Sequence, residues 1–382
     1  MPLFLVLYFS IYGILHLYAL RKATVSLNMS KKTTRLLGLI MLMMILAPIL
    51  ARVAERAGLS TGLSELAYIA FSWMGLLFIF VSVSAVIDLA RLFSFVFLKL
   101  CKKRSSRRRL AGPIFFYLSL GLTLTLYGYG LFEATNLKQE HIVIESPKIP
   151  AAIGKIRIAQ ISDVHLGLFI RKQQLLKILN LITKAKPDLM VSTGDLIDGQ
   201  PNDLRQETEL LASFKPPLGK IAVTGNHEFY AGLEHSLKFT TAAGFTILQQ
   251  RAKTFAHLNV VGIDDSAVSS FHKLPSLNEA ELLAALPDNK FTLLLKHRPT
   301  INPASIGLFD LQLSGHTHKG QIFPFNLITW FLYPYPAGEL TKLARGSLYV
   351  SRGTATWGPP IRIFAPPEIT IIDLVHGNSA DL

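Results

Sequence analysis

Histidine, aspartate and asparagine gather in five short polar stretches in the second half of the sequence. These stretches are DVH at 163–165, GDLID at 194–198, GNHE at 225–228, a single histidine at 297 and GHTH at 315–318. Imidazole, carboxylate and amide groups without a thiolate suit divalent ions, and such oxygen-rich sets favour manganese or iron, with zinc as a further option. The candidate metal ligands are Asp163, His165, Asp195, Asn226, His297, His316 and His318.

Seven candidate ligands are more than one ion needs, because three Asp or His ligands would already hold it. Two ions that share a carboxylate would account for the number. Two metal ions about 3.5 to 4 Å apart stabilise both the attacking and the leaving oxygen in phosphoryl transfer. Taken singly, Asp163 and Asp195 could cap helices, Asn226 could hold a turn and His297 could be a core histidine. Their joint occurrence at five strand ends favours the metal site over these structural roles.

Each polar stretch follows a short apolar run that predicts a buried strand. The predicted strands are 155–162, 188–193, 220–225, 258–263, 291–297 and 311–315, and the predicted helices are 171–185, 203–213, 233–243 and 278–286. Alternating strands and helices predict an α/β fold with helices outside the sheet. Ligands of such sheets bind beyond the carboxyl ends of the strands, so the polar stretches should meet there.

The first 132 residues have a different composition, because long apolar stretches alternate with basic loops. The apolar stretches are 2–20, 36–51, 66–87 and 110–132, and they predict about four membrane-spanning helices. The first stretch lacks a basic start and a cleavage site, which favours a retained helix over a signal peptide. We therefore predict a transmembrane region at 1–132, a short linker at 133–154, a soluble domain at 155–375 and a tail at 376–382.

The net charge of +14 lies almost entirely in the membrane region, where 15 Lys and Arg face 3 Asp and Glu. The soluble part has 24 against 22 and no basic cluster, which argues against nucleic-acid binding. Basic loops stay on the cytoplasmic side, and both 21–35 and 99–109 are basic. This pattern predicts an integral membrane protein whose soluble domain lies outside the cytoplasm. The single cysteine, Cys101, cannot form an internal disulfide.

The five motifs, in this order, resemble those of the calcineurin-like metallophosphoesterase superfamily over about residues 155–374. The stretch SRGTATWGPPIRIFAPPEITIIDL is similar to the end of the bacterial, membrane-anchored YkuE-type phosphodiesterase branch. The resemblance implies a four-layer αββα sandwich, an α/β fold preceded here by the all-α transmembrane region. It also implies a dinuclear enzyme that hydrolyses phosphoric ester bonds, with two divalent ions as cofactors.

The resemblance further implies a role for each motif residue. Asp163, His165 and His318 would hold the first ion, Asn226, His297 and His316 the second, and Asp195 would bridge them. His227 would be the general acid, oriented by Asp198, and a metal-bridging hydroxide the nucleophile. Gly199 stands where phosphoprotein phosphatases carry arginine, which disfavours that activity. Arg171 and Arg298 are candidate phosphate contacts.

The leading functional prediction is a membrane-anchored phosphodiesterase that acts outside the cytoplasm. The alternatives are a cytoplasmic lipid-precursor pyrophosphatase and a receptor that only binds a phosphorylated ligand. The aromatic segment 321–340 is either a loop packed on its own domain or a surface whose Trp330, Tyr333 and Tyr335 face the bilayer. The expected partners are membrane lipids and a phosphorylated substrate, with no nucleic acid. In the second case, the substrate would be lipid-linked.

Overall fold

The computed structural model describes residues 2–57, 62–101, 112–199, 204–268 and 278–377. These residues form two compact units. The first comprises 1–132 with 358–361, and the second comprises 133–357 with 362–382. Most of the basic loop predicted at 99–109 lies outside the described residues.

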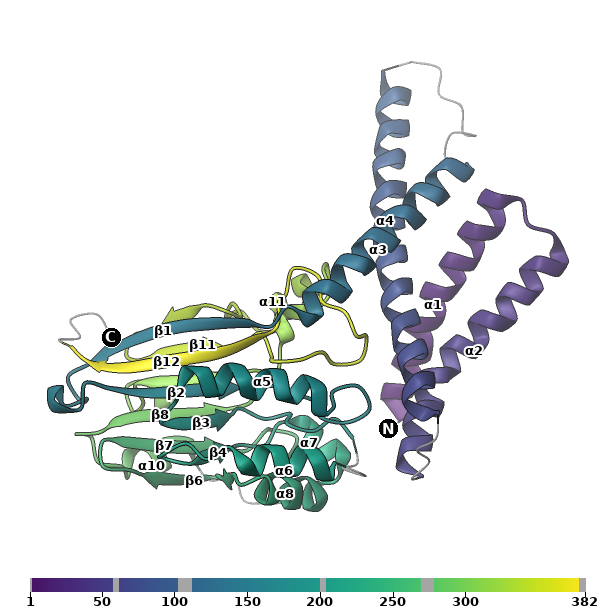
Figure 1. Cartoon of the computed structure of the whole chain (residues 1–382). Helices are drawn as coiled ribbons and strands as arrows, with labels where there is room; N and C mark the ends of the chain where they lie inside the picture. Colours follow the sequence, from purple (N-terminus) through teal and green to yellow (C-terminus); the bar gives the residue numbers. More distant parts are fainter. Residues whose placement is uncertain (1, 58–61, 102–111, 200–203, 269–277, 378–382) are drawn as a thin grey trace. The chain divides into compact units, whose positions relative to one another are not determined.

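The first unit is helical, as the apolar stretches predict. Its helices are α1 (Pro2–Leu27), α2 (Lys31–Arg56), α3 (Leu63–Leu100) and α4 (Pro113–Thr135), and α4 runs on into the second unit (Figure 1). Among the described residues, three helices are long and apolar enough to cross a membrane, namely Lys31–Glu55, Leu63–Leu100 and Pro113–Thr135. The fourth predicted span, 2–20, lies in α1, which is not one of these three. It contacts α3, because Trp73 Nε1 donates to His16 Nε2 at 2.9 Å.

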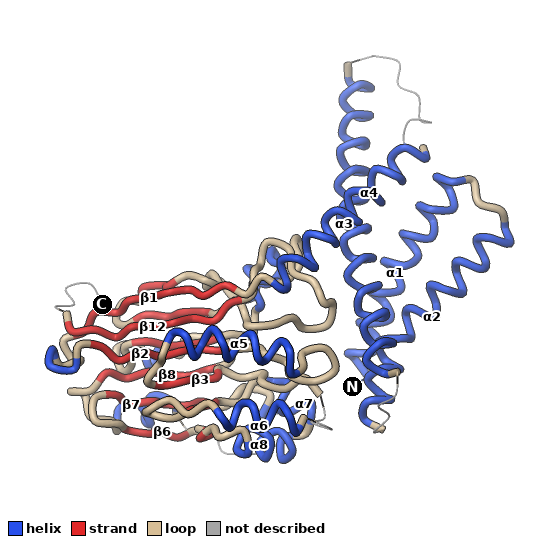
Figure 2. The backbone as a smooth tube through the Cα atoms, viewed as in Figure 1, coloured by secondary structure: helices blue, strands red, loops and turns tan. Residues whose placement is uncertain are grey.

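The second unit contains two six-stranded sheets (Figure 2). The order in the first is β1 (Lys138–Ser146), β12 (Glu368–His376), β2 (Lys155–Ile161), β3 (Leu189–Ser192), β4 (Lys220–Ala222) and β5 (Thr246–Ile247). The order in the second is β10 (Leu340–Lys342), β11 (Ser347–Val350), β9 (Leu311–Ser314), β8 (Phe291–Lys296), β7 (Leu258–Ile263) and β6 (Arg251–Thr254). Both sheets mix parallel and antiparallel pairs, with β2, β3 and β4 parallel in one and β7, β8 and β9 parallel in the other.

The strands are buried on both faces because alternate side chains point into two different hydrophobic cores, one between the sheets and one under the helices. In β2, Ile156 and Ile158 pack between the two sheets, whereas Ala159 and Ile161 pack under the helices. The helices on this outer face are α5 (Lys172–Ala185), α6 (Arg205–Ser213) and α8 (Leu233–Ala242). The short helix α10 (Glu279–Ala284) covers the outer face of the second sheet through Leu283. The predicted four-layer αββα sandwich is therefore confirmed.

Helix α5 shows why the covering helices form where the sequence predicts them. Its buried residues Leu175, Ile178, Leu179 and Ile182 recur at helical spacing, which gives one apolar face. The helix ends at Ala185, and the next residue, Lys186, has a left-handed φ of 51°. Strand β1 was not expected, since it lies within the predicted linker. Its nine residues pair in parallel with β12, which ties the segment after α4 into the first sheet.

Candidate metal centre

The polar stretches follow strands of both sheets and meet at one edge of the sandwich. Asp163 comes after β2, Asp195 after β3, and Asn226 begins α7 (Asn226–Ala231) after β4. In the second sheet, His297 follows β8 and His316 follows β9. Backbone hydrogen bonds join neighbouring loops, from Asp163 N to Gly194 O at 3.0 Å and from Gly315 N to His297 O at 2.8 Å. The carboxyl ends of the parallel strands thus place all the predicted site residues together.

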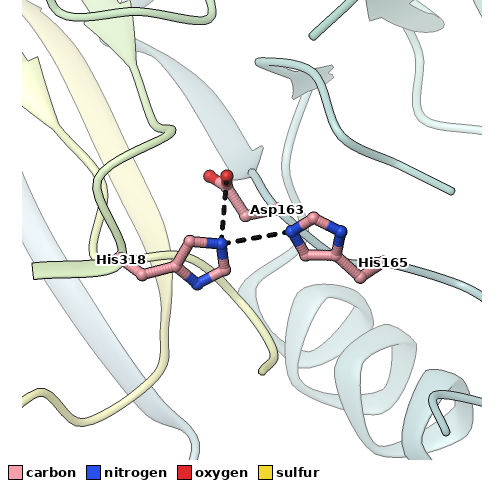
Figure 3. A group of neighbouring side chains, drawn as sticks. All are labelled: Asp163, His165 and His318. Atoms are coloured by element: carbon pink, nitrogen blue, oxygen red, sulfur yellow. Dashed lines mark hydrogen bonds and ion pairs between the residues drawn. The ribbon is translucent and has the colours of Figure 1, made fainter. Parts of the chain in front are cut away.

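The first group contains Asp163, His165 and His318, which are all buried (Figure 3). His318 Nε2 lies 3.1 Å from His165 Nε2 and 3.4 Å from Asp163 Oδ1. Two imidazole nitrogens and a carboxylate oxygen therefore surround one point. This donor set suits a divalent ion of the manganese, iron or zinc type.

The second group contains Asp195, His297 and His316. His297 Nε2 lies 3.2 Å from Asp195 Oδ2 and 3.2 Å from His316 Nδ1. His297 Nδ1 lies 2.8 Å from the carbonyl oxygen of Thr193, to which it can donate. When Nδ1 donates this bond, the lone pair on Nε2 is available for a metal ion. Histidine ligands in metal sites are commonly oriented in this way.

Asp195 lies between the two groups. Its Oδ2 is 3.2 Å from His297 Nε2 and 3.9 Å from His165 Nε2. Its Oδ1 accepts a hydrogen bond of 2.9 Å from the backbone N of His227, the second residue of α7. One carboxylate therefore contacts a ligand of each group and the start of the next helix.

Asn226 supplies the clearest test of whether these residues fit metal ions. Its Oδ1 is buried and has no hydrogen-bond partner among the described residues. A buried acceptor without a partner costs about 1–3 kcal/mol, so the fold tolerates it only where something else satisfies the oxygen. A bound cation beside Asp195 would do so, and the donor set around it therefore fits a metal centre.

The sequence pattern of the calcineurin-like phosphoesterases matches residues 156–320, which include all seven candidate metal ligands. An uncharacterized metallophosphoesterase of Aquifex aeolicus is 36% identical over 255 residues, which cover 66% of this chain and 97% of that protein. The chain belongs to the calcineurin-like phosphoesterase family. It is thus a phosphoester hydrolase by family.

Two further relatives concern the branch of the family to which the chain is similar and its membrane region. The uncharacterized metallophosphoesterase YkuE of Bacillus subtilis is 30% identical over 289 residues, covering 72% of this chain and 100% of that protein. A Danio rerio protein described as a transmembrane protein with a metallophosphoesterase domain is 31% identical over 291 residues, covering 72% of this chain and 66% of that protein. The predicted resemblance to membrane-anchored relatives of YkuE is confirmed.

His227 and Asp198, the predicted acid and its partner, form a buried ion pair beside the two groups. His227 Nδ1 lies 3.0 Å from Asp198 Oδ1, and His165 Nδ1 lies 3.6 Å from the same oxygen. Burial lowers the pKa of His227, but the charges of Asp195 and Asp198 outweigh it and raise the pKa to about 9. His227 is therefore protonated near neutral pH and can donate a proton.

Burial and neighbouring charges shift the pKa values of all three residues in the second group. Burial raises the pKa of Asp195, but the His297 and His227 charges hold it well below its usual range. Burial lowers the pKa of His297, yet Asp195 raises it overall to about 10. Burial and the positive His297 and Arg298 lower the pKa of His316 to about 3. A neutral imidazole thus lies beside a strongly paired one, and a metal ion would replace the proton of that pair.

The backbone at the site is held in an uncommon conformation. Left-handed φ angles of 48° to 72° occur at Asp163, His165, Asp195, His316 and His318. Such angles are rare outside glycine and persist only where surrounding structure fixes them, often at functional sites. Close packing also explains two glycines of the motifs. A Cβ at Gly225 would overlap the Asp195 carboxylate, and one at Gly315 would overlap Ser162 and Asp163.

Glu228 is a functional residue that the sequence analysis did not assign. Its buried carboxylate accepts hydrogen bonds from the backbone N of Gly225 at 2.7 Å, Asp195 at 3.0 Å and Leu196 at 2.8 Å. It therefore clamps the Asp195 loop to the start of α7. The signal was present in the sequence, since Glu228 directly follows the candidate residues Asn226 and His227.

Arg362 is a second residue that the sequence analysis did not assign. Its side chain is fully buried, and Nη1 donates to the carbonyls of Arg352 and Ala365 at 2.8 Å each. Its Nη2 donates to the carbonyl of Ala355 and lies 3.1 Å from His318 Nδ1. Burial and the nearby Arg362 charge hold the pKa of His318 well below its usual value, so His318 is neutral.

The two candidate phosphate contacts lie in different settings. Arg298 directly follows His297, and its Nε donates to Asp265 at 2.8 Å while Nη1 donates to the Tyr333 hydroxyl at 3.2 Å. Tyr333 in turn lies edge-on to His316, with ring centroids 5.4 Å apart. Arg171 precedes α5, where its backbone N donates to Gln174. Of the two, Arg298 is connected through Tyr333 to the candidate metal ligand His316.

Proposed function

We propose that the chain is a membrane-anchored phosphodiesterase that uses two divalent metal ions. The observation that carries this proposal is the position of the Asp195 carboxylate, 3.2 Å from His297 and 3.9 Å from His165, between two groups of ligands. Two bound ions, with Mn²⁺ the best match to the donor set, would stabilise charge on phosphate oxygens and supply a nucleophile from water near neutral pH.

In this proposal the position of each side chain determines its role. Asp163, His165 and His318 would hold one ion, Asn226, His297 and His316 would hold the other, and both ions would share Asp195. Water loses a proton to the solvent, and the resulting hydroxide bonds to phosphorus as the bond to the leaving oxygen breaks. His227 gives its proton to that oxygen, and Asp198 keeps His227 protonated and oriented.

Aromatic rings beside two of the histidines support a diester over a monoester. Trp357 lies edge-on to His227 with ring centroids 5.6 Å apart, and Tyr333 lies 5.4 Å from the ring of His316. Apolar and aromatic walls with few polar groups are typical of sites that bind organic ligands. A phosphodiester carries an organic group on each side of phosphorus and so suits a site with a ring beside each histidine.

We further propose that the phosphoesterase domain lies outside the cytoplasm. This rests on the two basic loops, 21–35 and 99–109, which lie on either side of two predicted spans and favour the cytoplasmic side. A cytoplasmic domain that cleaves lipid-precursor pyrophosphates is the alternative within the family, and sidedness separates the two.

The test compares hydrolysis of bis(4-nitrophenyl) phosphate and 4-nitrophenyl phosphate by the purified full chain. We expect faster cleavage of the diester, dependence on added Mn²⁺ and complete loss after chelation. Asp195→Ala should lose both activity and metal, whereas Asp288→Ala, which removes an exposed carboxylate, should match the wild type. Bound metal without turnover would instead favour a receptor for phosphorylated ligands. Activity in Asp195→Ala would refute the shared carboxylate.

A further inference from the structure

Helix α11 (Asn326–Leu332, NLITWFL) is apolar yet has no buried residue. The exposed fraction is 59% for Leu327, 67% for Trp330 and 82% for Phe331. A helix on the surface of a soluble domain normally buries an apolar stripe and exposes a polar one. This helix instead exposes its apolar side chains, so the water-soluble part of the fold does not account for its sequence.

The exposed apolar surface extends beyond the helix. The rings of Phe323 and Phe364 lie 6.0 Å apart, and both side chains are exposed. We use "aromatic patch" for the exposed residues Phe323, Phe325, Leu327, Ile328, Trp330, Phe331, Leu332 and Phe364. Scattered apolar residues are normal on a protein surface, but a group of this kind marks an interaction site.

The aromatic patch is joined to the metal centre on one side. Helix α11 packs against the turn His318–Gly320, which contains the ligand His318. At its other end, Leu332 is followed by Tyr333, whose ring faces His316 and whose hydroxyl accepts from Arg298. The position of Tyr333 argues against the expectation that it faces the bilayer. Tyr335 packs against Leu348 and Val350, so among the three residues named from sequence only Trp330 lies in the patch.

The patch is joined to a membrane helix on the other side. The backbone N of Phe364 donates to Glu133 Oε2 at 2.8 Å. Glu133 lies in the last turn of α4, which is long and apolar enough to cross a membrane. Strand β1 then begins at Lys138, three residues after α4 ends at Thr135. An exposed group of aromatic residues held at the end of a span is at the depth where Trp and other aromatic side chains favour the membrane interface.

We propose that the aromatic patch inserts into the headgroup layer of the bilayer, and that the substrate is a phosphodiester carried by a membrane lipid. The substrate part of this proposal rests on the proposed function. Insertion would place the turn with His316 and His318 beside the lipid headgroups. A lipid-borne phosphate would then reach the metal centre without leaving the membrane, whereas a soluble diester would have no such advantage.

The insertion is tested without any catalysis. The chain has one cysteine, so Cys101→Ser gives a background for single cysteines at Phe331, in the patch, or at Ile306, an exposed position before β9. Each is labelled with a fluorophore in the full chain, reconstituted in vesicles of phosphatidylcholine and phosphatidylglycerol. Lipids with a nitroxide near the headgroup should quench the Phe331 label and spare the Ile306 label.

Two results would overturn the insertion. Quenching of the Phe331 label by aqueous iodide but not by lipid nitroxide would show that the patch faces water. Protection from both quenchers would show that protein covers it, either the chain's own membrane helices or a second copy. The proposal predicts neither, because it requires contact with lipid.

The substrate class is tested with two matched probes, hexadecyl and ethyl 4-nitrophenyl phosphate, which share the reacting group. In the same vesicles we expect faster cleavage of the hexadecyl probe. The double variant Trp330→Ser, Phe331→Ser should lower that preference by about tenfold or more, because two exposed aromatic anchors are lost. Its cleavage of the ethyl probe should be unchanged, and Ile306→Ser should keep the preference.

The outcomes separate the two proposals. Cleavage of neither probe by the wild type would refute the proposed function, while the fluorescence result would still decide the insertion. Cleavage of the ethyl probe without a preference for the hexadecyl probe, or with a preference that survives in the double variant, would overturn the lipid-borne substrate.

Discussion

His227 Nδ1 lies 3.0 Å from Asp198 Oδ1, in a buried pair that keeps one proton beside the candidate metal centre. With the pKa of His227 raised to about 9, the imidazole is a proton donor at neutral pH. His227→Asn should therefore keep its metal and lower kcat by about 10²- to 10⁴-fold, the usual contribution of general acid catalysis. Metal analysis and steady-state kinetics check both parts.

The leaving group distinguishes acid catalysis from a structural role of His227. An alkoxide needs a proton as it leaves far more than a nitrophenolate does. The variant should therefore lose more activity with an alkyl leaving group than with 4-nitrophenol, and Asp198→Asn should show the same trend more weakly. An equal loss with both leaving groups would assign His227 to structure alone.

Arg362 should affect metal affinity through the backbone around His318, because its guanidinium donates to the carbonyls of Arg352 and Ala365 at 2.8 Å each and lies 3.1 Å from His318 Nδ1. Loss of the surroundings that orient a metal ligand typically costs about 10- to 100-fold in affinity. We expect Arg362→Gln to weaken the binding of one Mn²⁺ by this factor and to lower the unfolding temperature, since buried carbonyls lose their donor. Calorimetric titration measures the first effect. A destabilised variant with unchanged Mn²⁺ affinity would limit Arg362 to a structural role.

Lys220 makes the stability of the phosphoesterase domain depend on pH. Its ammonium is buried against the carbonyls of Leu211 and Ala243, and burial, then Lys215, lower its pKa from 10.5 to about 8. Between these values the unfolded chain binds more protons, so the free energy of unfolding should rise with pH from about 8 to 10.5, by about 3 kcal/mol in all. Lys220→Met should lack this rise in denaturant titrations. An identical pH profile for both proteins would contradict the prediction.

The side of the membrane is tested by reporter fusions. A reporter that is active only outside the cytoplasm should be active when fused after residue 382 and silent when fused within the basic run near residue 105. The reason is that basic loops are retained inside. The opposite pattern would support the cytoplasmic pyrophosphatase.

Much of the fold was predictable, because hydrophobic pattern and strand-end chemistry agree. Each of the six predicted strands corresponds to an observed one, as 155–162 does to β2, and each ligand motif lies at the end of its strand. The reason is physical. Buried parallel strands must be continuous apolar runs, and their carboxyl ends are where polar side chains can converge.

Other features could not be predicted because they depend on contacts distant in sequence. Arg362 lies in an apolar stretch, and only the fold brings it to His318, 44 residues earlier. Strand β1 alternates polar and apolar residues after a membrane helix, and its pairing with β12 joins residues at opposite ends of the domain. Helix α11 could not be predicted because its apolar residues share no single face. The periodicity of the sequence therefore does not distinguish buried from exposed positions there.

Electron paramagnetic resonance of the Mn²⁺-loaded full chain tests whether two metal ions share Asp195. The wild type should bind about two Mn²⁺ per chain and show the spectrum of an exchange-coupled pair, because a bridging carboxylate holds such ions about 3.5 to 4 Å apart. Asn226→Ala should lose one ion and the coupling, leaving a mononuclear spectrum. An active wild type that binds a single uncoupled Mn²⁺ would contradict the account.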